Sequence, residues 1–199
     1  MRTGWLVLAL LVMSRHAAAE DITVCIATTG LVLTGGATSI ATSVFQKAGV
    51  AIAWQCPGAR ASGGPRTWLP IELVEGTPDE RLPGVLAVSH PYARCTKGIT
   101  VYYDRVQSLA HGTNRESALL AYVLVHEITH VIQGINRHSQ TGVMKAHWSE
   151  EDQAAIVERR LGFEDKDVRL IRQGLATGWC GDTSGLMARS EPETAFRPE

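Results

Sequence analysis

The sequence lacks the features that several large classes of protein require. It has no basic run and no stripe of Arg or Lys, and 19 basic residues nearly balance 20 acidic ones, so no nucleic-acid surface is indicated. Beyond the N-terminus, no apolar stretch is long enough for a membrane-spanning helix. There is no internal repeat and no low-complexity tract. These absences leave an ordinary globular domain.

The N-terminal segment, residues 1–19, is expected to be an export signal. Its apolar run WLVLALLVM is short for a bilayer, and the small residues at Ala17–Ala19 suit a cleavage site. Cleavage after Ala19 also removes Arg2 and Arg15, which leaves a net charge near −3 on one domain. A short membrane anchor is the alternative, although Arg15 interrupts the apolar run. We therefore expect a secreted or periplasmic protein without a membrane span after cleavage.

Cysteine is scarce, and the four cysteines include no CxxC pair, which argues against a cysteine-based zinc site. In an exported chain, an even number of cysteines predicts two disulfides, with three possible connectivities. We favour a bond between Cys56 and Cys95, because both lie at the edges of predicted strands beside loops.

The remaining chain predicts an α+β domain at residues 20–178 and a loose polar tail at 179–199. Stretches rich in β-branched residues predict strands in DITVCIATTGLVL, VAIAWQC, PIELVEG, VLAVSH and GITVYYDRV. The stretch TSIATSVFQKAGV predicts a first helix that ends at Gly49. We expect a twisted mixed sheet of about four or five strands, packed on this helix and on a second, longer one.

The long helix, at about 114–133, is apolar on nearly every face, so we expect it to run buried through the domain. Thr113 and Glu116 have the spacing of a capping box at its start, and Gly134 is a typical helix stop. Short C-terminal helices are predicted at about 149–161, with Ser149 as the cap, and at about 165–175.

Histidine is also scarce, yet four of the seven histidines lie within residues 125–148. His126 and His130 are four residues apart on the long helix, so their Cβ atoms should lie about 5–6 Å apart on one face. Both rings can then bind one cation. Glu127 lies between them, where a general base can act beside the ion without binding it.

A tetrahedral catalytic zinc site needs a third protein ligand and one open position. Gly134 can adopt a positive φ and turn the chain back after the helix, so His138 is the expected third ligand. Met144 is expected to form an apolar floor under the histidines. If His138 lies in a surface loop instead, the ligand would come from a downstream group, namely His147, Glu150, Glu151 or Asp152.

This stretch resembles the metzincin zinc endopeptidases, whose motif HExxHxxGxxH is followed by a methionine-containing turn. The matching residues are His126, Glu127, His130, Gly134, His138 and Met144. More narrowly, it is similar to small exported bacterial proteins with a shortened zincin domain, in which HSxTGxM precedes a tryptophan, here His138 to Met144 and Trp148. Those proteins are predicted metallopeptidases. The resemblance implies a zincin-like fold.

The sequence also departs from the metzincin pattern. Gly134 and His138 follow His130 by four and eight residues, where the family has three and six. Thr129 replaces a frequent glycine, and Ala146 stands where some members carry a tyrosine. The oxyanion-stabilising tyrosine therefore has no counterpart here, and Arg137 or His147 would have to replace it.

We expect an exported, monomeric zinc peptidase. Zn²⁺ would be held by His126, His130 and His138, with Glu127 as general base, and the substrate would be a peptide or protein. The stretch VLAVSH is expected to be an edge strand that holds an extended peptide above the site. The altered spacing favours one alternative, a non-catalytic exported metal-binding or scaffold protein on a zincin fold. An enzyme acting on a non-peptide amide or on the cell wall would use the same residues.

Overall fold

The computed structural model describes residues 20–28, 35–55, 68–76, 84–180 and 194–196. The expected export signal at 1–19 and the position of Cys56 lie outside these residues. The favoured disulfide therefore stays a prediction, as does export. Within the described part of the chain, no helix is both long enough and apolar enough to cross a membrane.

One layer of the fold is a mixed sheet of six strands in the order β2-β1-β3-β5-β4-β6. The strands are β1 (Glu20–Thr28), β2 (Val50–Gln55), β3 (Trp68–Val74), β4 (Ala87–Ser89), β5 (Ile99–Tyr102) and β6 (Thr194–Phe196). The neighbouring strands β2, β1, β3 and β5 pair in parallel, whereas β4 runs antiparallel to both β5 and β6. The α+β class is confirmed. The sheet is larger than expected because residues 194–196, within the predicted loose tail, add a strand.

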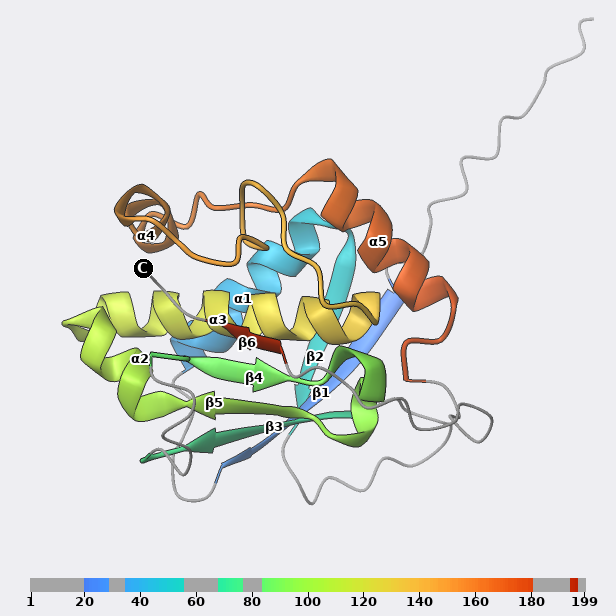
Figure 1. Ribbon diagram of the computed structural model, residues 1–199, viewed down its shortest axis with the longest axis horizontal. Coiled ribbons are helices and arrows are strands. Elements are labelled where there is room, and N and C mark those ends of the chain that lie inside the picture. Colours follow the sequence, from blue (N-terminus) through green and yellow to red (C-terminus); the bar gives the residue numbers. More distant parts are fainter. Residues whose placement is uncertain (1–19, 29–34, 56–67, 77–83, 181–193, 197–199) are drawn as a thin grey trace, which may run out of the picture.

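Helices make up the rest of the described fold. They are α1 (Gly35–Lys47), α2 (Tyr103–Ala110), α3 (Thr113–Gln133), α4 (Glu150–Val157) and α5 (Asp165–Ala176), with a 3-10 helix, η1 (Pro91–Thr96). In Figure 1, α3 crosses the molecule between the sheet and the pair α4 and α5, and it contacts both of these helices. The predicted order of one early helix, one long helix and short C-terminal helices is confirmed.

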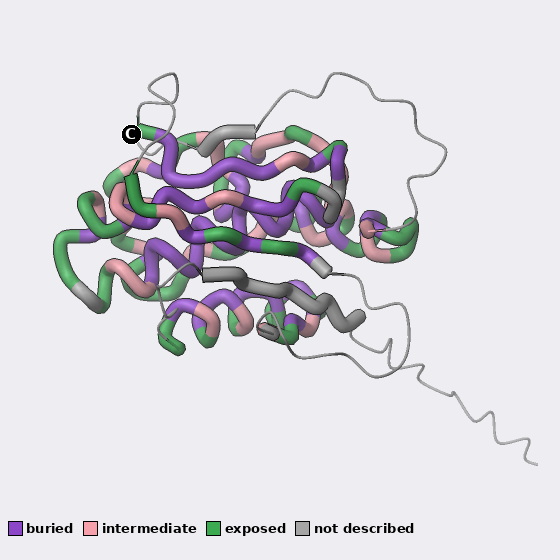
Figure 2. The backbone as a smooth tube through the Cα atoms, turned by 90° about the horizontal axis from the view of Figure 1, so that it is seen from below, coloured by how far each residue is buried: buried purple, intermediate pink, exposed green. Residues whose placement is uncertain are grey.

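The core lies between the sheet and α3. Every residue from Ala118 to Ile132 is buried, as the apolar pattern of the long helix predicts. Along β3, Leu69, Ile71 and Leu73 are buried, while Pro70 and Glu72 are exposed. This alternation puts one face of β3 against the core and the other toward solvent. Figure 2 shows buried positions along the inner strands and on the inner sides of the helices.

Two local predictions are wrong. The stretch GITVYYDRV is not one strand, because β5 ends at Tyr102 and α2 begins at Tyr103. Tyr103, Val106 and Ala110 recur at helical spacing and are all buried, which favours the helix. At the start of α3 the N-cap residue is Gly112 and no side chain caps the helix, while the Glu116 carboxylate accepts a hydrogen bond from the Tyr103 hydroxyl. By contrast, the Ser149 cap of α4 is confirmed, with Asp152 completing its capping box.

The strand VLAVSH is not at the edge of the sheet. Its structured part, β4, lies between β5 and β6. The edge predicted for peptide binding is therefore covered by the C-terminal strand of the same chain.

Candidate metal centre

His126 and His130 project from the buried C-terminal half of α3, and both are fully buried. Their Nε2 atoms lie 3.0 Å apart. Nδ1 of His126 lies 2.9 Å from the carbonyl oxygen of Val143, and Nδ1 of His130 lies 3.1 Å from that of Ile135. Because a carbonyl oxygen only accepts, each Nδ1 carries the proton of its neutral ring. The two Nε2 lone pairs then face each other.

The electrostatics keep these rings neutral. Burial, followed by the nearby His130 ring, holds the pKa of His126 well below its usual value. Burial and the nearby His138 lower the pKa of His130 to about 3. Neutral imidazole is the form that binds a metal ion, and hydrogen bonds from the second ring nitrogen to carbonyl groups are typical of metal-ligating histidines.

Gly134 ends α3 in the left-handed conformation, with φ 64°, as predicted. Its N–H donates to the carbonyl groups of His130 and Val131. The chain then turns back, and His138 joins the pair: one potential ligand atom from each of the three histidines lies within 4.8 Å of the others. The Nε2 atom of His138 is buried and has no hydrogen-bond partner among the described residues.

These donors fit a metal ion. Zn–N bonds of about 2.0–2.1 Å at tetrahedral angles require nitrogens about 3.3 Å apart, close to the separation of the helix pair. The third ligand atom, on His138, lies within 4.8 Å of the other two, so a side-chain adjustment would bring it into bonding distance of the same ion. The His138 nitrogen that lacks a hydrogen-bond partner among the described residues would be satisfied by a cation shared with His126 and His130.

A buried aspartate on α5 anchors the loop that carries His138. Asp167 is fully buried, and its carboxylate lies 2.7 Å from Nη1 of Arg137. It also accepts a hydrogen bond from the Ser139 hydroxyl, whose oxygen lies 2.7 and 2.8 Å from the two carboxylate oxygens. Both neighbours of His138 are thus tied to one carboxylate, which positions the ring between them. Arg137, considered as an oxyanion stabiliser, is engaged in this ion pair.

The turn after His138 forms a second support. Gly142 has φ 74°, and a Cβ there would lie 2.4 Å from the carbonyl oxygen of Gly162, so only glycine fits. The next residue, Val143, donates its N–H to that same Gly162 oxygen. The carbonyl of Val143 in turn accepts from His126 Nδ1 at 2.9 Å and from the Trp148 indole at 3.2 Å.

Met144 and Trp148 are fully buried in this turn. The Trp148 ring meets His126 edge to face, with centroids 6.0 Å apart. The Met144 carbonyl accepts the N–H of Ser139 at 2.7 Å, which closes the turn. Burial of Met144 agrees with an apolar floor, and its contact with the histidines stays a prediction.

Glu127 is fully buried, and burial raises its pKa to about 8, although a hydrogen bond from Ser89 acts in the opposite direction. Oγ of Ser89, on β4, donates to Oε2 of Glu127 at 2.5 Å. The other carboxylate oxygen, Oε1, is buried without a hydrogen-bond partner among the described residues. The carboxylate is therefore held by one oxygen, and the other is left to accept or donate a proton.

The other candidate ligands do not join the three histidines. His147 is exposed, and Glu150, Glu151 and Asp152 form the first turn of α4. His90 is the N-cap residue of η1, without a side-chain capping bond, and His111 is the C-cap residue of α2. Sequence reasoning missed Ser89 and Asp167. Ser89 ends a predicted strand beside His90, and Asp167 has box spacing after Glu164, but neither pattern indicates a contact with the site.

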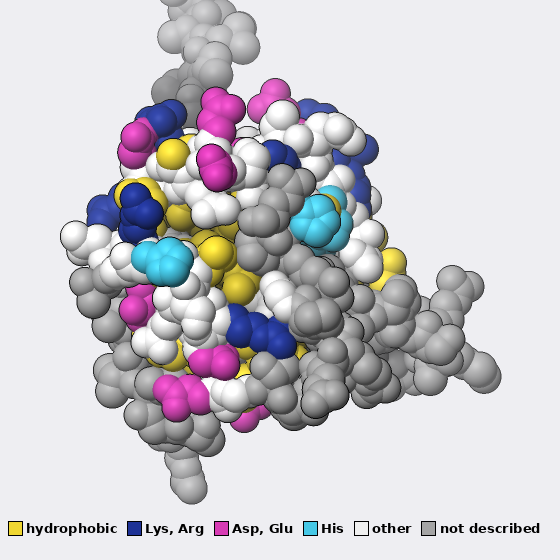
Figure 3. Space-filling model, turned by 60° about the vertical axis from the view of Figure 1, so that its left-hand side comes forward, with side chains coloured by type: hydrophobic (Ala, Val, Ile, Leu, Met, Phe, Trp, Pro, Cys, Tyr) yellow, Lys and Arg dark blue, Asp and Glu magenta, His cyan; other side chains and the backbone are white. Residues whose placement is uncertain are grey.

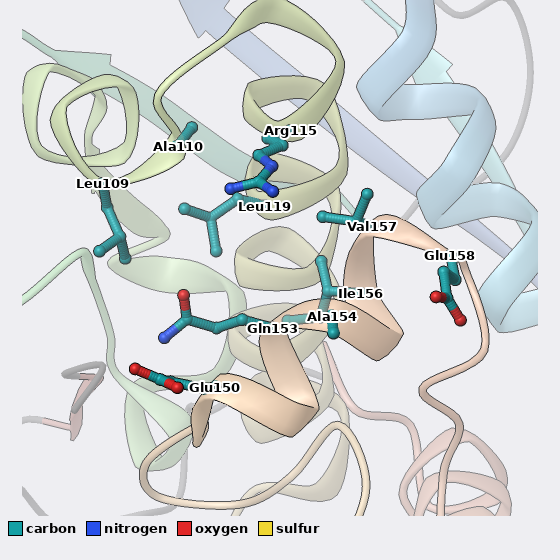
Figure 4. A pocket seen from close by; sticks show the side chains of 10 residues that line it. All are labelled: Leu109, Ala110, Arg115, Leu119, Glu150, Gln153, Ala154, Ile156, Val157 and Glu158. Carbon is teal, nitrogen blue, oxygen red and sulfur yellow. The ribbon is translucent and has the colours of Figure 1, made fainter.

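A cavity of about 430 Å³ lies elsewhere, beside the N-terminal half of α3. Figure 4 shows Arg115 and Leu119 of α3 on one side of it and Gln153 and Val157 of α4 on the other. Leu119 precedes His126 by seven residues, about 10 Å along the helix, so this cavity is separate from the histidines. On the face drawn in Figure 3, acidic and basic side chains are interspersed, without a patch of one sign.

In comparisons with known proteins, no family model matches this chain and no curated protein shows significant sequence similarity to it.

Proposed function

We propose that this chain is an exported zinc-dependent peptidase. The observation that carries the proposal is the convergence of His126, His130 and His138 beside a buried carboxylate, Glu127, that is not among the grouped ligands. A zinc ion held by these three nitrogens would keep one coordination position for water or substrate, as catalytic rather than structural zinc sites do. The fold we propose is zincin-like. It is supported by one long central helix carrying both histidines, next to a mixed sheet.

The chain's own residues supply the proton transfers. When bound, zinc would act as a Lewis acid that polarises the scissile carbonyl and acidifies water. Glu127 takes the proton of the attacking water and later gives it to the leaving amine. Ser89 holds Oε2, so Oε1 is the oxygen that exchanges the proton. His126 and His130 keep their Nε2 lone pairs available because Val143 and Ile135 hold their Nδ1 protons.

The test compares two variants of the full chain. Both Glu127→Gln and the unaltered protein should bind one zinc per chain, but the variant should lose about 10²–10⁴-fold in the hydrolysis of a peptide library, because the substitution removes only the base. Its matched control is Glu151→Gln, an exposed acid on α4, which should change neither quantity. Undiminished hydrolysis in Glu127→Gln would refute the base assignment.

His138→Ala should lower zinc affinity sharply, since it removes one of three ligands. His147→Ala, the exposed histidine in the same stretch, is its control and should leave affinity unchanged. A hydroxamate inhibitor completes the test, because it needs the open coordination position. A chain that binds zinc but neither binds hydroxamate nor hydrolyses peptides would be the non-catalytic metal-binding protein instead.

A further inference from the structure

The C-terminal strand β6 occupies the outer edge of β4. The two strands pair antiparallel, with Ala87 opposite Phe196, Val88 opposite Ala195 and Ser89 opposite Thr194. Figure 1 shows β6, in dark red, beside β4. The other edge of β4 is paired with β5. Both sides of β4 are therefore filled by strands of the same chain.

β4 belongs to the candidate metal centre. Its residue Ser89 donates to Oε2 of Glu127 at 2.5 Å, so the strand holds the proposed base directly. Adjacent strands in a sheet lie about 4.7–4.9 Å apart. The main chain at Thr194, which is opposite Ser89, is thus one strand spacing from the residue that positions the base.

We propose that the outer edge of β4 is the peptide-binding edge of this centre, and that β6 is a built-in strand that blocks it. The inference rests on the proposed peptidase function. An extended peptide recognised through main-chain hydrogen bonds needs an open sheet edge next to the site. β6 makes the pairing that such a peptide would make, so the two compete for one edge.

The C-terminal segment is suited to reversible pairing. β6 has only three residues, and prolines at positions 192 and 198 lack the N–H needed to extend a ladder on either side. A ladder this short is weak by itself. Because β6 belongs to the same chain as β4, its pairing is intramolecular, and covalent linkage can give effective concentrations in the millimolar range. A substrate strand with more main-chain bonds can therefore displace it.

The experiment uses the full chain with Ala195→Pro and Phe196→Pro together. Consecutive residues of a strand point their N–H groups in opposite directions, so one of the two prolines removes a donor toward β4. Hydrogen exchange should accelerate at least about tenfold for those amides of residues 87–89 that face β6, independently of any activity, while the amides that face β5 stay protected. Hydrolysis of an extended peptide should rise at least about tenfold in kcat/KM, mostly through KM. Prolines at Ser190 and Glu191, outside β6, are the control and should change neither.

A second measurement covers the case in which the prolines disturb folding. A labelled peptide of residues 190–199 should bind the double variant at least about tenfold more tightly than the unaltered chain, and the same peptide with both prolines should not bind. Unchanged exchange at residues 87–89, or equal peptide binding to both proteins, would overturn the proposal. Faster exchange and tighter peptide binding without any hydrolysis would support the edge assignment and contradict the peptidase. If the unaltered chain hydrolyses the peptide and the double variant does so no faster, the proposed blocking role of β6 is wrong. The peptidase proposal is not affected by that result.

Discussion

Asp167 offers a test of whether the third histidine is positioned from a distant helix. Asp167→Asn preserves the size of the side chain but removes its charge and replaces one acceptor oxygen by a donor. The change should break the ion pair with Arg137 or the hydrogen bond from Ser139, since both bonds need an acceptor. The backbone of His138 lies between these two partners, so its ring should lose its fixed position.

The magnitude follows from the contacts. A hydrogen bond to a charged group contributes about 1.5–3 kcal/mol, and a buried group left unpaired costs about as much again. The Arg137 side chain is 24% exposed, so solvent screening reduces its share. We expect a loss of about 2–3 kcal/mol in the free energy of unfolding, which is roughly 5–10 °C in Tm for a domain of this size. Zinc affinity should fall about 10–100-fold, as for other residues that orient metal ligands.

The assay is thermal unfolding with a chelator present, followed by zinc competition against a chromophoric chelator. Asp165→Asn is the matched control, because it removes an exposed charge from the same first turn of α5. A Tm for Asp167→Asn within 2 °C of this control would refute the stabilising network, by the same conversion. A lower Tm with unchanged zinc affinity would show that the network stabilises the fold without positioning His138.

Two further predictions concern the base and the cap of α4. Ser89→Ala should lower kcat about 10–100-fold at unchanged zinc content, because Glu127 loses the hydrogen bond that orients it. Ser89→Thr keeps a hydroxyl and should restore most of the activity. Full activity in the alanine variant would contradict this role of Ser89. Burial tends to raise the pKa of Asp152, but the bonds from Lys145 and Ser149 outweigh it and lower the pKa below its usual value. Its stabilising effect is therefore present above the unfolded pKa, about 3.9, and is lost as pH falls through the folded pKa. Asp152→Asn should lower Tm at pH 7, and the gap to the unaltered chain should close below about pH 4; a gap that stays constant with pH would disprove the linkage.

Local sequence patterns were sufficient to predict the part of the site that lies on α3. The four-residue spacing of His126 and His130 and the apolar surround of the long helix both follow from the 3.6-residue period, and the structure confirms them. Gly134 as the helix stop was also predictable, since few other residues adopt φ 64° without strain.

The part of the site in the loop after α3, namely His138, could only be proposed from a motif. Whether His138 returns depends on Asp167, whose contact with Ser139 spans 28 residues of sequence. A contact between residues so far apart in the sequence is set by how α5 packs on α3, and the periodicity of apolar residues does not encode this packing. The same holds for Ser89 and Glu127, which come together because β4 packs against α3.

The C-terminal strand shows a different limit. Residues 194–196 sit in a polar, proline-containing stretch, and composition predicts a loose tail there. A three-residue strand draws its stability from the neighbour it pairs with rather than from its own propensity. The edge position assigned to VLAVSH failed for the same reason, because a partner from the far end of the chain fills it.

The Val143 carbonyl joins two rings through one oxygen, because it accepts from both His126 and the Trp148 indole. A carbonyl oxygen has two lone pairs, so both are used and the orientations of the imidazole and the indole are coupled. An ion that draws on the imidazole polarises this shared oxygen and changes the surroundings of the indole. If the centre binds zinc, loading should therefore change the emission of Trp148, one of five tryptophans in the sequence, and this intrinsic signal requires no added dye.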